Sequence, residues 1–335
     1  MDSVTIYNVG TRRYRVSAPL DVSSGSSSEK FTTKTASHGT RTNKTHRTTI
    51  PVARALHRFL IGQQGTTLSS IREVSHCKIT VPRETAKSDT VELEGSEEEI
   101  QKAQELIDKV VKENLHKVAY THFLSLPIGD LDVQRKVGEF QKDIHGEFFK
   151  CLSDSSFNKP ATMHVTVGML RLLTAADVQG AVTLLKSMHQ EVYDLLGTRS
   201  LVVKIGNPAA MEANPSKARV IYLGLEDFEG AERVEKICEL VRGRFKAAGL
   251  IDEERPLKIH ATIMKAKRES PTANDESSQG PDDRRRDARI NAVPMLRKYG
   301  ELSFGTCKIG QIQIAKRFHF TEAGAYDSEG AIVLP

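Results

Sequence analysis

Two short stretches of the sequence each place a histidine and a threonine two residues apart between apolar neighbours. Residues 163–167 read Met-His-Val-Thr-Val, and residues 259–263 read Ile-His-Ala-Thr-Ile. This alternation is typical of a half-buried strand, whose side chains point in turn to opposite faces. If the two strands are neighbours, two imidazoles and two hydroxyls meet in one cleft. The candidate catalytic residues are therefore His164, Thr166, His260 and Thr262.

Two facing imidazoles can act as a general base and a general acid, because the unperturbed pKa of histidine lies near neutrality. In a phosphodiester reaction, one imidazole takes a proton from the attacking water or 2′-hydroxyl, and the other gives one to the leaving oxygen. The threonine hydroxyls can donate hydrogen bonds to the oxygens on which negative charge develops. No Asp, Glu or Cys cluster with metal-site spacing accompanies the histidines, which favours chemistry without a metal or another cofactor. A zinc site with two histidines and a distant carboxylate is the alternative.

The His-x-Thr pattern by itself is weakly specific. It also occurs at 38–40, 46–48 and 319–321, but the first two lie in a polar region without apolar alternation. His319 is the strongest rival because Phe318 and Phe320 flank it, but the strand is expected to end near Thr321. Only the stretches at 163–167 and 259–263 have apolar residues on both sides of both polar positions.

A similar unit precedes each of the two histidine strands. The first unit has a predicted strand at 121–127 and a helix at about 131–150, and the second has a strand at 220–225 and a helix at about 228–248. This near-repeat predicts two strand–helix–strand lobes, related by a pseudo-twofold axis, around a central cleft. The alternative is an ordinary α+β domain in which both histidines are surface residues of edge strands.

These strands, together with THFLSLP at 121–127 and FGTCKIGQIQIAKRF at 304–318, resemble the two-histidine (2H) phosphoesterase family. The resemblance implies a 2H phosphoesterase domain over residues 119–335. It also implies RNA-type substrates, either 2′,3′-cyclic phosphates or the 3′ end of an RNA chain. Which histidine is the base and which is the acid stays open at this point.

Residues 48–115 predict the order strand–helix–helix–strand–strand–helix, with a G-x-x-G loop at 62–65 between the first two helices. Thr66 or Thr67 is expected to cap the second helix, and Ser96 with Glu99 predicts a capping box on the third. This order (βααββα) resembles a type I KH domain, in which the loop clamps a nucleic-acid backbone beside a groove for about four single-stranded bases. The resemblance makes five residues candidates for RNA binding: Gly62, Gln63, Gln64, Gly65 and Arg58.

The middle of this loop departs from the usual KH pattern. Gln63 and Gln64 stand where a KH loop usually carries at least one Lys or Arg. The backbone N–H groups can still meet phosphate, but one Coulombic contribution is missing. The alternative is a KH fold retained for packing or for contact with a protein.

All of the net charge of +5 lies in the N-terminal part of the chain. Residues 1–50 hold eight Lys and Arg against three Asp and Glu, and the other 285 residues hold 40 of each. A Ser-rich, basic tail over 1–47 is expected to be mostly disordered, and a mobile insertion is expected at about 267–289. The tail is read as a solvated arm, with an RNA-holding or partner-holding arm as the alternative. No apolar run has membrane-spanning length, and four scattered cysteines indicate reduced thiols.

The sequence thus predicts an α+β protein with a KH domain at 48–115 and a 2H phosphoesterase domain at 119–335, closely joined by a short junction. The predicted function is a metal-independent RNA phosphodiesterase that its KH domain guides to single-stranded RNA. The alternative is a non-catalytic RNA-binding subunit whose cleft only holds phosphate or an RNA end. The resemblance to proteins that combine both domains further implies a nuclear location and membership of a helicase-containing coactivator and repair complex, without a membrane partner.

Overall fold

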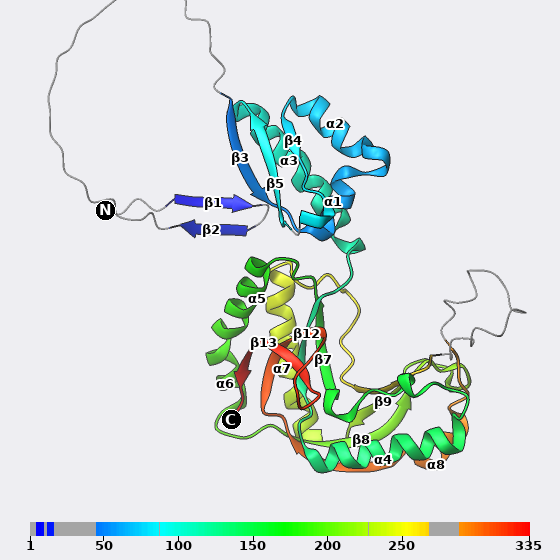
Figure 1. Ribbon diagram of the computed structural model, residues 1–335. Coiled ribbons are helices and arrows are strands. Elements are labelled where there is room, and N and C mark those ends of the chain that lie inside the picture. Colours follow the sequence, from blue (N-terminus) through cyan, green and yellow to red (C-terminus); the bar gives the residue numbers. More distant parts are fainter. Residues whose placement is uncertain (1–4, 10–11, 17–44, 87, 227, 268–287) are drawn as a thin grey trace, which may run out of the picture. The chain divides into compact units, whose positions relative to one another are not determined.

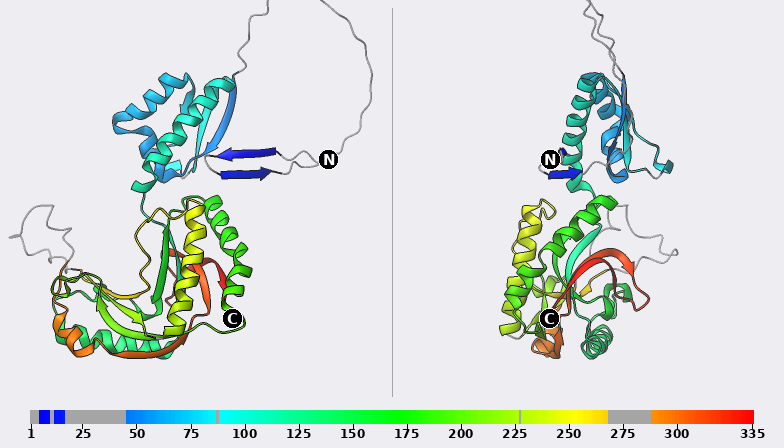
Figure 2. Two further views of the ribbon diagram at one scale, coloured as in Figure 1. Left: turned by 180° about the vertical axis from the view of Figure 1, so that it is seen from behind. Right: turned by 90° about the vertical axis from the view of Figure 1, so that its left-hand side faces the viewer.

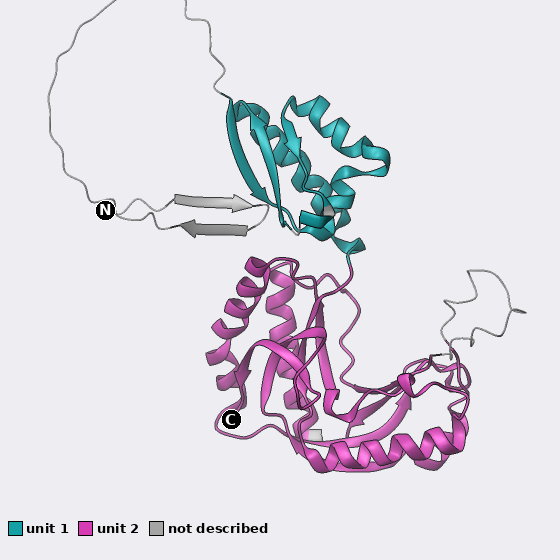
Figure 3. Ribbon diagram, in the orientation of Figure 1, with its two compact units in different colours: residues 1–118 teal, residues 119–335 magenta. Residues whose placement is uncertain are grey.

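The computed structural model describes residues 5–9, 12–16 and 45–335, except residues 87, 227 and 268–287 (Figure 1). The chain divides into two compact units, 1–118 and 119–335 (Figure 3). The predictions for the tail and for the insertion at 267–289 fall mostly outside the described residues. Within the tail, β1 (Thr5–Val9) pairs antiparallel with β2 (Arg12–Val16). Among the described residues, no helix is long and apolar enough to cross a membrane.

The first unit contains a three-stranded antiparallel sheet in the order β3-β5-β4, with three helices. The buried stripes of all three helices supply its core, including Leu56, Leu60, Ile71 and Ile107. The order of the elements is the predicted βααββα. They are β3 (His46–Pro51), α1 (Arg54–Ile61), α2 (Thr66–Ser75), β4 (Lys78–Thr80), β5 (Thr90–Gly95) and α3 (Glu97–Asn114).

The helix caps of this unit agree with the prediction in one case and differ in the other. Ser96 Oγ accepts a hydrogen bond from the Glu99 N–H, and the Glu99 carboxylate accepts one from the Ser96 N–H, which is the predicted capping box. The predicted threonine cap of α2 is wrong. Gly65 occupies the N-cap position, and the Thr66 hydroxyl instead donates to the Gln63 carbonyl, 2.9 Å away.

The second unit is built on one eight-stranded sheet in which all neighbouring strands are antiparallel, in the order β11-β8-β9-β10-β7-β6-β12-β13. The sheet consists of two four-stranded halves that meet where β10 pairs with β7. The register of that pairing consists of one residue pair, Ala261 with Val165. The strands are β6 (His122–Pro127), β7 (His164–Leu170), β8 (Val202–Ala210), β9 (Val220–Leu225), β10 (Ala261–Lys265), β11 (Ser303–Lys308), β12 (Gln311–Phe320) and β13 (Tyr326–Val333).

Helices cover the apolar face of this sheet. Helix α7 packs on β7, β8 and β9, α5 packs on β13, and α4 packs on β11 beside α8. Helix α6 lies along α7, as two views of the molecule show (Figures 1 and 2). The buried residues of this layer form the main core of the unit. The helices are α4 (Leu131–Phe148), α5 (Ala175–Ser187), α6 (His189–Leu196), α7 (Phe228–Ala247) and α8 (Val293–Tyr299).

The two predicted strand–helix–strand lobes correspond to β6-α4-β7 and β9-α7-β10. On one side of the junction β6 lies next to β7, and on the other side β9 lies next to β10. The two lobes therefore occupy equivalent places in the two halves of the sheet. Two details differ from the sequence-based expectation. Helices α5 and α6 were not predicted, and His260 immediately precedes β10 instead of lying inside it.

Candidate active site

The register at the junction brings the four candidate catalytic residues together. Ala261 lies opposite Val165, and both side chains are buried in the core. Residues that flank an antiparallel pair lie opposite each other and point to the other face. His260 is therefore across from Thr166, and Thr262 is across from His164. This register places the two imidazoles and the two hydroxyls, alternating in type, at four neighbouring positions on the face opposite the buried Ala261–Val165 pair, an arrangement that we call the square.

The two histidines are held by the same type of hydrogen bond. Nδ1 of His164 lies 2.8 Å from the Thr162 carbonyl oxygen, and Nδ1 of His260 lies 2.6 Å from the Lys258 carbonyl oxygen. A carbonyl oxygen only accepts hydrogen bonds, so in each ring Nδ1 must carry the proton. This leaves Nε2 as the nitrogen that can take or give a proton. In each case the acceptor lies two residues before the histidine, which matches the pseudo-symmetry of the lobes.

Aromatic rings flank both imidazoles. The Phe123 ring lies 4.8 Å from the His164 ring, between centroids, and the Tyr326 ring meets His164 edge to face at 5.5 Å. On the other side of the junction, the Tyr222 ring meets His260 edge to face at 5.4 Å. Phe123 and Tyr222 come from β6 and β9, which are equivalent strands of the two lobes. His164 is thus enclosed by two aromatic rings and His260 by one.

This enclosure affects the protonation of both histidines. Burial lowers the pKa of His164 to about 4, and the nearby positive charges of Lys265 and His260 act in the same direction. Burial also lowers the pKa of His260, with Lys258 and Lys265 contributing. Apolar surroundings and nearby cations both disfavour the charged imidazolium. Both rings therefore favour the neutral form in the free protein at neutral pH, His164 more strongly than the ordinary pKa of histidine suggests.

Sequence reasoning did not single out the cations near this site, which include Lys265 and Arg317. Lys265 acts electrostatically on both histidines, and desolvation together with the charge of Arg317 lowers the pKa of Lys265. A β-bulge between Thr262 and Met264 interrupts the alternation of β10, so Ile263 and Met264 are both buried. After this extra residue, Lys265 returns to the face of Thr262. Strict alternation would have placed Lys265 on the core face.

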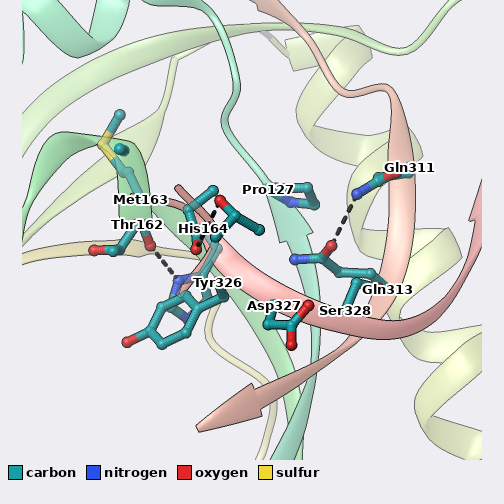
Figure 4. A pocket seen from close by; sticks show the side chains of 12 residues that line it. Pro127, Thr162, Met163, His164, Gln311, Gln313, Tyr326, Asp327 and Ser328 are labelled. Carbon is teal, nitrogen blue, oxygen red and sulfur yellow. Dashed lines mark hydrogen bonds between the residues drawn. The ribbon is translucent and has the colours of Figure 1, made fainter. Parts of the chain in front are cut away.

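A cavity of about 340 Å³ adjoins His164 (Figure 4). The ends of β6, β12 and β13 and the segment before β7 form its wall. Gln311 and Gln313 are joined there by a hydrogen bond of 2.8 Å, and Tyr326 closes it on the side of His164. His319 lines a different cavity, which it shares with Phe318 at the end of β12. Among the described residues, no three His, Cys, Asp or Glu side chains are grouped to hold a metal ion.

The candidate RNA-binding loop of the first unit connects α1 to α2. Gly62 has a φ of +71°, and a Cβ atom there would lie 2.2 Å from the Thr67 hydroxyl, so this position requires glycine. Gln64 also has a positive φ, +52°. Gln63 and Gln64 are exposed, and the Arg58 guanidinium covers the Phe59 ring at 4.6 Å, one turn before the loop. The loop therefore presents backbone and two neutral amides to solvent, with the Arg58 guanidinium nearby.

The chain is similar to known proteins over both units. Residues 120–334 match the family described as "AKAP7 2'5' RNA ligase-like domain", and residues 47–109 match the KH domain family. Activating signal cointegrator 1 complex subunit 1 of Mus musculus is 26% identical over 298 residues, which cover 85% of this chain and 83% of the mouse protein.

Solved structures are similar to each unit in turn. E. coli LigT complexed with 3'-AMP aligns with a TM-score of 0.39 at 11% identity, covering 64% of this chain and 98% of LigT. The fourth KH type I domain of human vigilin aligns with a TM-score of 0.21 at 29% identity, covering 29% of this chain and 95% of that domain.

Proposed function

Because the chain belongs to the family of AKAP7 2'5' RNA ligase-like domains, we propose that residues 119–335 form an RNA phosphodiesterase and that the KH domain guides single-stranded RNA to it. The observation that supports this most strongly is the square of two imidazoles and two hydroxyls at the β7–β10 junction. Both rings have Nδ1 fixed on a carbonyl oxygen, so both present Nε2 for proton transfer.

The proposed reaction is hydrolysis of a 2′,3′-cyclic phosphate. His164, with the pKa of about 4, is neutral and takes a proton from the attacking water through Nε2. Water bonds to phosphorus, one of the two ribose P–O bonds breaks, and His260, in the imidazolium form that the bound phosphate anion favours, gives its Nε2 proton to the leaving ribose oxygen. Thr166 and Thr262 donate hydrogen bonds to the non-bridging oxygens, and Lys265 adds a positive potential near them. The proton carriers are side chains, so the reaction needs no metal.

The test is incubation of the full chain with short RNAs that end in a 2′,3′-cyclic phosphate or a 3′-hydroxyl, followed by mass spectrometry of the ends. The expected result is that the cyclic end gains the mass of one water and becomes a monoester. RNA that binds but keeps its cyclic end would favour the alternative, a non-catalytic subunit whose cleft only holds phosphate.

The pH dependence follows from the lowered pKa values of the histidine pair. Turnover needs one neutral and one protonated imidazole, so kcat/KM is greatest between the two apparent pKa values of the pair in the free protein. Both values are lowered, so we expect a bell-shaped profile with its maximum below pH 6.5. A bound phosphate anion favours both imidazolium forms, so kcat should peak at a higher pH than kcat/KM. A kcat/KM maximum at pH 7.5 or above would contradict the proposed environment.

In this proposal the KH domain is a second RNA-binding site on the chain. Replacing Gln63 and Gln64 together by Asp places two negative charges where the loop meets phosphate, which should weaken binding of long single-stranded RNA by about tenfold. Both side chains are exposed, so the fold should be unaffected. Catalytic efficiency should fall on a long RNA and stay constant on a dinucleotide, which fills only the cleft.

The matched control is the double replacement of Gln63 and Gln64 by Asn, which keeps the amides without adding charge. If the Asp variant loses efficiency equally on long and short substrates, the domain has been damaged generally. If it loses none on either, the KH domain serves a protein partner instead of RNA.

We also propose that the protein is nuclear and belongs to a multi-subunit, helicase-containing coactivator and repair complex. The support is its similarity to a mouse protein whose name describes a subunit of an activating signal cointegrator complex. Cell fractionation and co-purification from nuclear extract test this. A protein found only outside the nucleus, without a helicase among its partners, would contradict it.

A further inference from the structure

The end of strand β12 exposes two large aromatic rings. Phe318 is 74% exposed and Phe320 is 50% exposed, whereas Phe149 and Phe304 of the same unit are buried in its core. Phenyl rings gain most from leaving water, so two exposed rings two residues apart form an unusual surface. A surface of this kind indicates a ligand with apolar faces.

The backbone at Phe318 is strained as well as exposed. Its φ is +63°, the left-handed region that bulky residues rarely adopt. Residues held in this region cluster at binding sites, where the strain fixes a side chain in place. The neighbouring Arg317 guanidinium lies 4.6 Å from the centre of the Phe318 ring and donates a 2.7 Å hydrogen bond to the Tyr120 carbonyl oxygen. The Phe318 ring is thus presented to solvent next to an anchored cation.

The Phe320 ring is continuous with the candidate active site, and the Phe318 ring, two residues earlier on β12, lines the neighbouring cavity that contains His319. The Phe320 ring lies 5.1 Å from the Tyr326 ring at an angle of 34°, and Tyr326 in turn meets His164 at 5.5 Å. Figure 4 shows Tyr326 beside His164 at the edge of the cavity. The positive charge of Arg317 acts electrostatically on both the Tyr326 hydroxyl and the Lys265 ammonium group. Aromatic faces and cations therefore extend together from the catalytic pair to the surface.

We propose that Phe318, Phe320 and Tyr326, which we call the hairpin platform, stack the bases of the RNA nucleotides next to the phosphate held at His164. Unpaired bases stack on aromatic side chains, and nearby cations meet the phosphates between them. The cations Arg317 and Lys265 lie near these rings. This favours single-stranded RNA, whose phosphates can meet the cations, over an apolar protein segment, which has no anionic group for them. The hairpin platform binds the substrate of the proposed phosphodiesterase, so this inference rests on that function.

The test uses an RNA trinucleotide with a 3′-phosphate, which cannot turn over, and with the fluorescent base 2-aminopurine at its 3′-terminal nucleotide. Stacking on the platform should quench the fluorescence when the full chain binds. Phe320→Leu keeps an apolar side chain but removes the ring, so it should weaken binding about 5- to 150-fold and lose most of the quenching. Leu131→Ala, at a residue that is 79% exposed on α4, is the matched control and should bind as the wild type does. The KH domain is the same in all of these proteins.

Phe318→Gly separates binding from stability. Glycine adopts a positive φ freely, so this variant should unfold at the same or a higher temperature than the wild type while binding the trinucleotide more weakly. A ring that serves only the fold would give the opposite pattern, with a lower unfolding temperature and unchanged binding.

The outcomes distinguish this inference from the proposed function. Wild-type turnover with unchanged quenching and affinity in Phe318→Gly and Phe320→Leu would overturn the platform and leave the phosphodiesterase intact. If the quenching depends on the rings but the wild type does not open a cyclic phosphate, the platform would be supported and the proposed phosphodiesterase function would be contradicted. A protein partner that binds the wild type but not Phe320→Leu, with equal RNA affinity in both, would also overturn the platform.

Discussion

His164→Ala and His260→Ala should each lower kcat/KM for a 2′,3′-cyclic phosphate by about 10²- to 10⁴-fold, because each removes one proton carrier. The two imidazoles transfer different protons in the same displacement step, so the double variant should be only slightly slower than the slower single variant. Initial rates of ring opening on a short RNA measure this. Additive losses in the double variant would mean that the two histidines do not work as a unit.

The control for this experiment is His319→Ala, which alters the third apolar-flanked histidine of the chain. His319 is exposed and lines a cavity that does not include His164, so this variant should keep near wild-type activity. Circular dichroism and the unfolding temperature should be close to wild type in all three variants. Full activity in His164→Ala or His260→Ala would rule out the two-histidine mechanism.

Thr166→Val and Thr262→Val should each lower kcat by about 10²- to 10³-fold, which is the usual effect of removing one donor to a developing negative charge. Valine keeps the shape and the β-branching of threonine, so the strands should remain intact. Thr166→Ser and Thr262→Ser retain the hydroxyl and should recover most of the rate. Measuring kcat separately from KM is essential, because these hydrogen bonds strengthen only as charge builds on the phosphate.

An unchanged kcat in Thr166→Val would contradict the square of four side chains. In that case the hydroxyl would serve the strand and not the phosphate. A loss in Thr166→Ser as large as that in Thr166→Val would point to packing as the cause, since the serine variant lacks only the methyl group.

Much of the fold was accessible from the sequence because local signals agreed with one another. The predicted fold class, a KH domain followed by a 2H phosphoesterase domain, is confirmed by the family matches. The alternation around His164 and His260 predicted which face each side chain takes. The α3 capping box was readable because Ser96 and Glu99 stand three residues apart before a helical apolar stripe.

The environment of the site depends on pairings between distant parts of the chain, which local patterns do not encode. Phe123 and Tyr326 enclose His164 from strands β6 and β13, which are separated by about two hundred residues in sequence. The single Ala261–Val165 pair sets the square of side chains, and no local pattern specifies that register. The sequence did not predict Lys265 at the site because of the β-bulge in β10. Strict alternation assigns the wrong face to every residue after an inserted one.

The segments missed or misplaced have similar causes. In the first unit, Gly65 at the α2 N-cap displaced the expected threonine because the loop needs a positive φ there. Helix α5 carries a capping box, with Thr174 and Asp177, that would have revealed its start. These details do not alter the site, since α5 packs on β13 and α6 on α7, behind the sheet.

The most direct test of the central claim is hydrolysis of an RNA 2′,3′-cyclic phosphate by the full chain in excess EDTA, compared with His260→Ala under the same conditions. Side chains carry both protons in this account, so the wild type should open the ring at the same rate with and without EDTA, and His260→Ala should open it about 10²- to 10⁴-fold more slowly. Activity that EDTA abolishes and zinc restores would contradict the account, because the histidines would then be metal ligands and not the acid and the base.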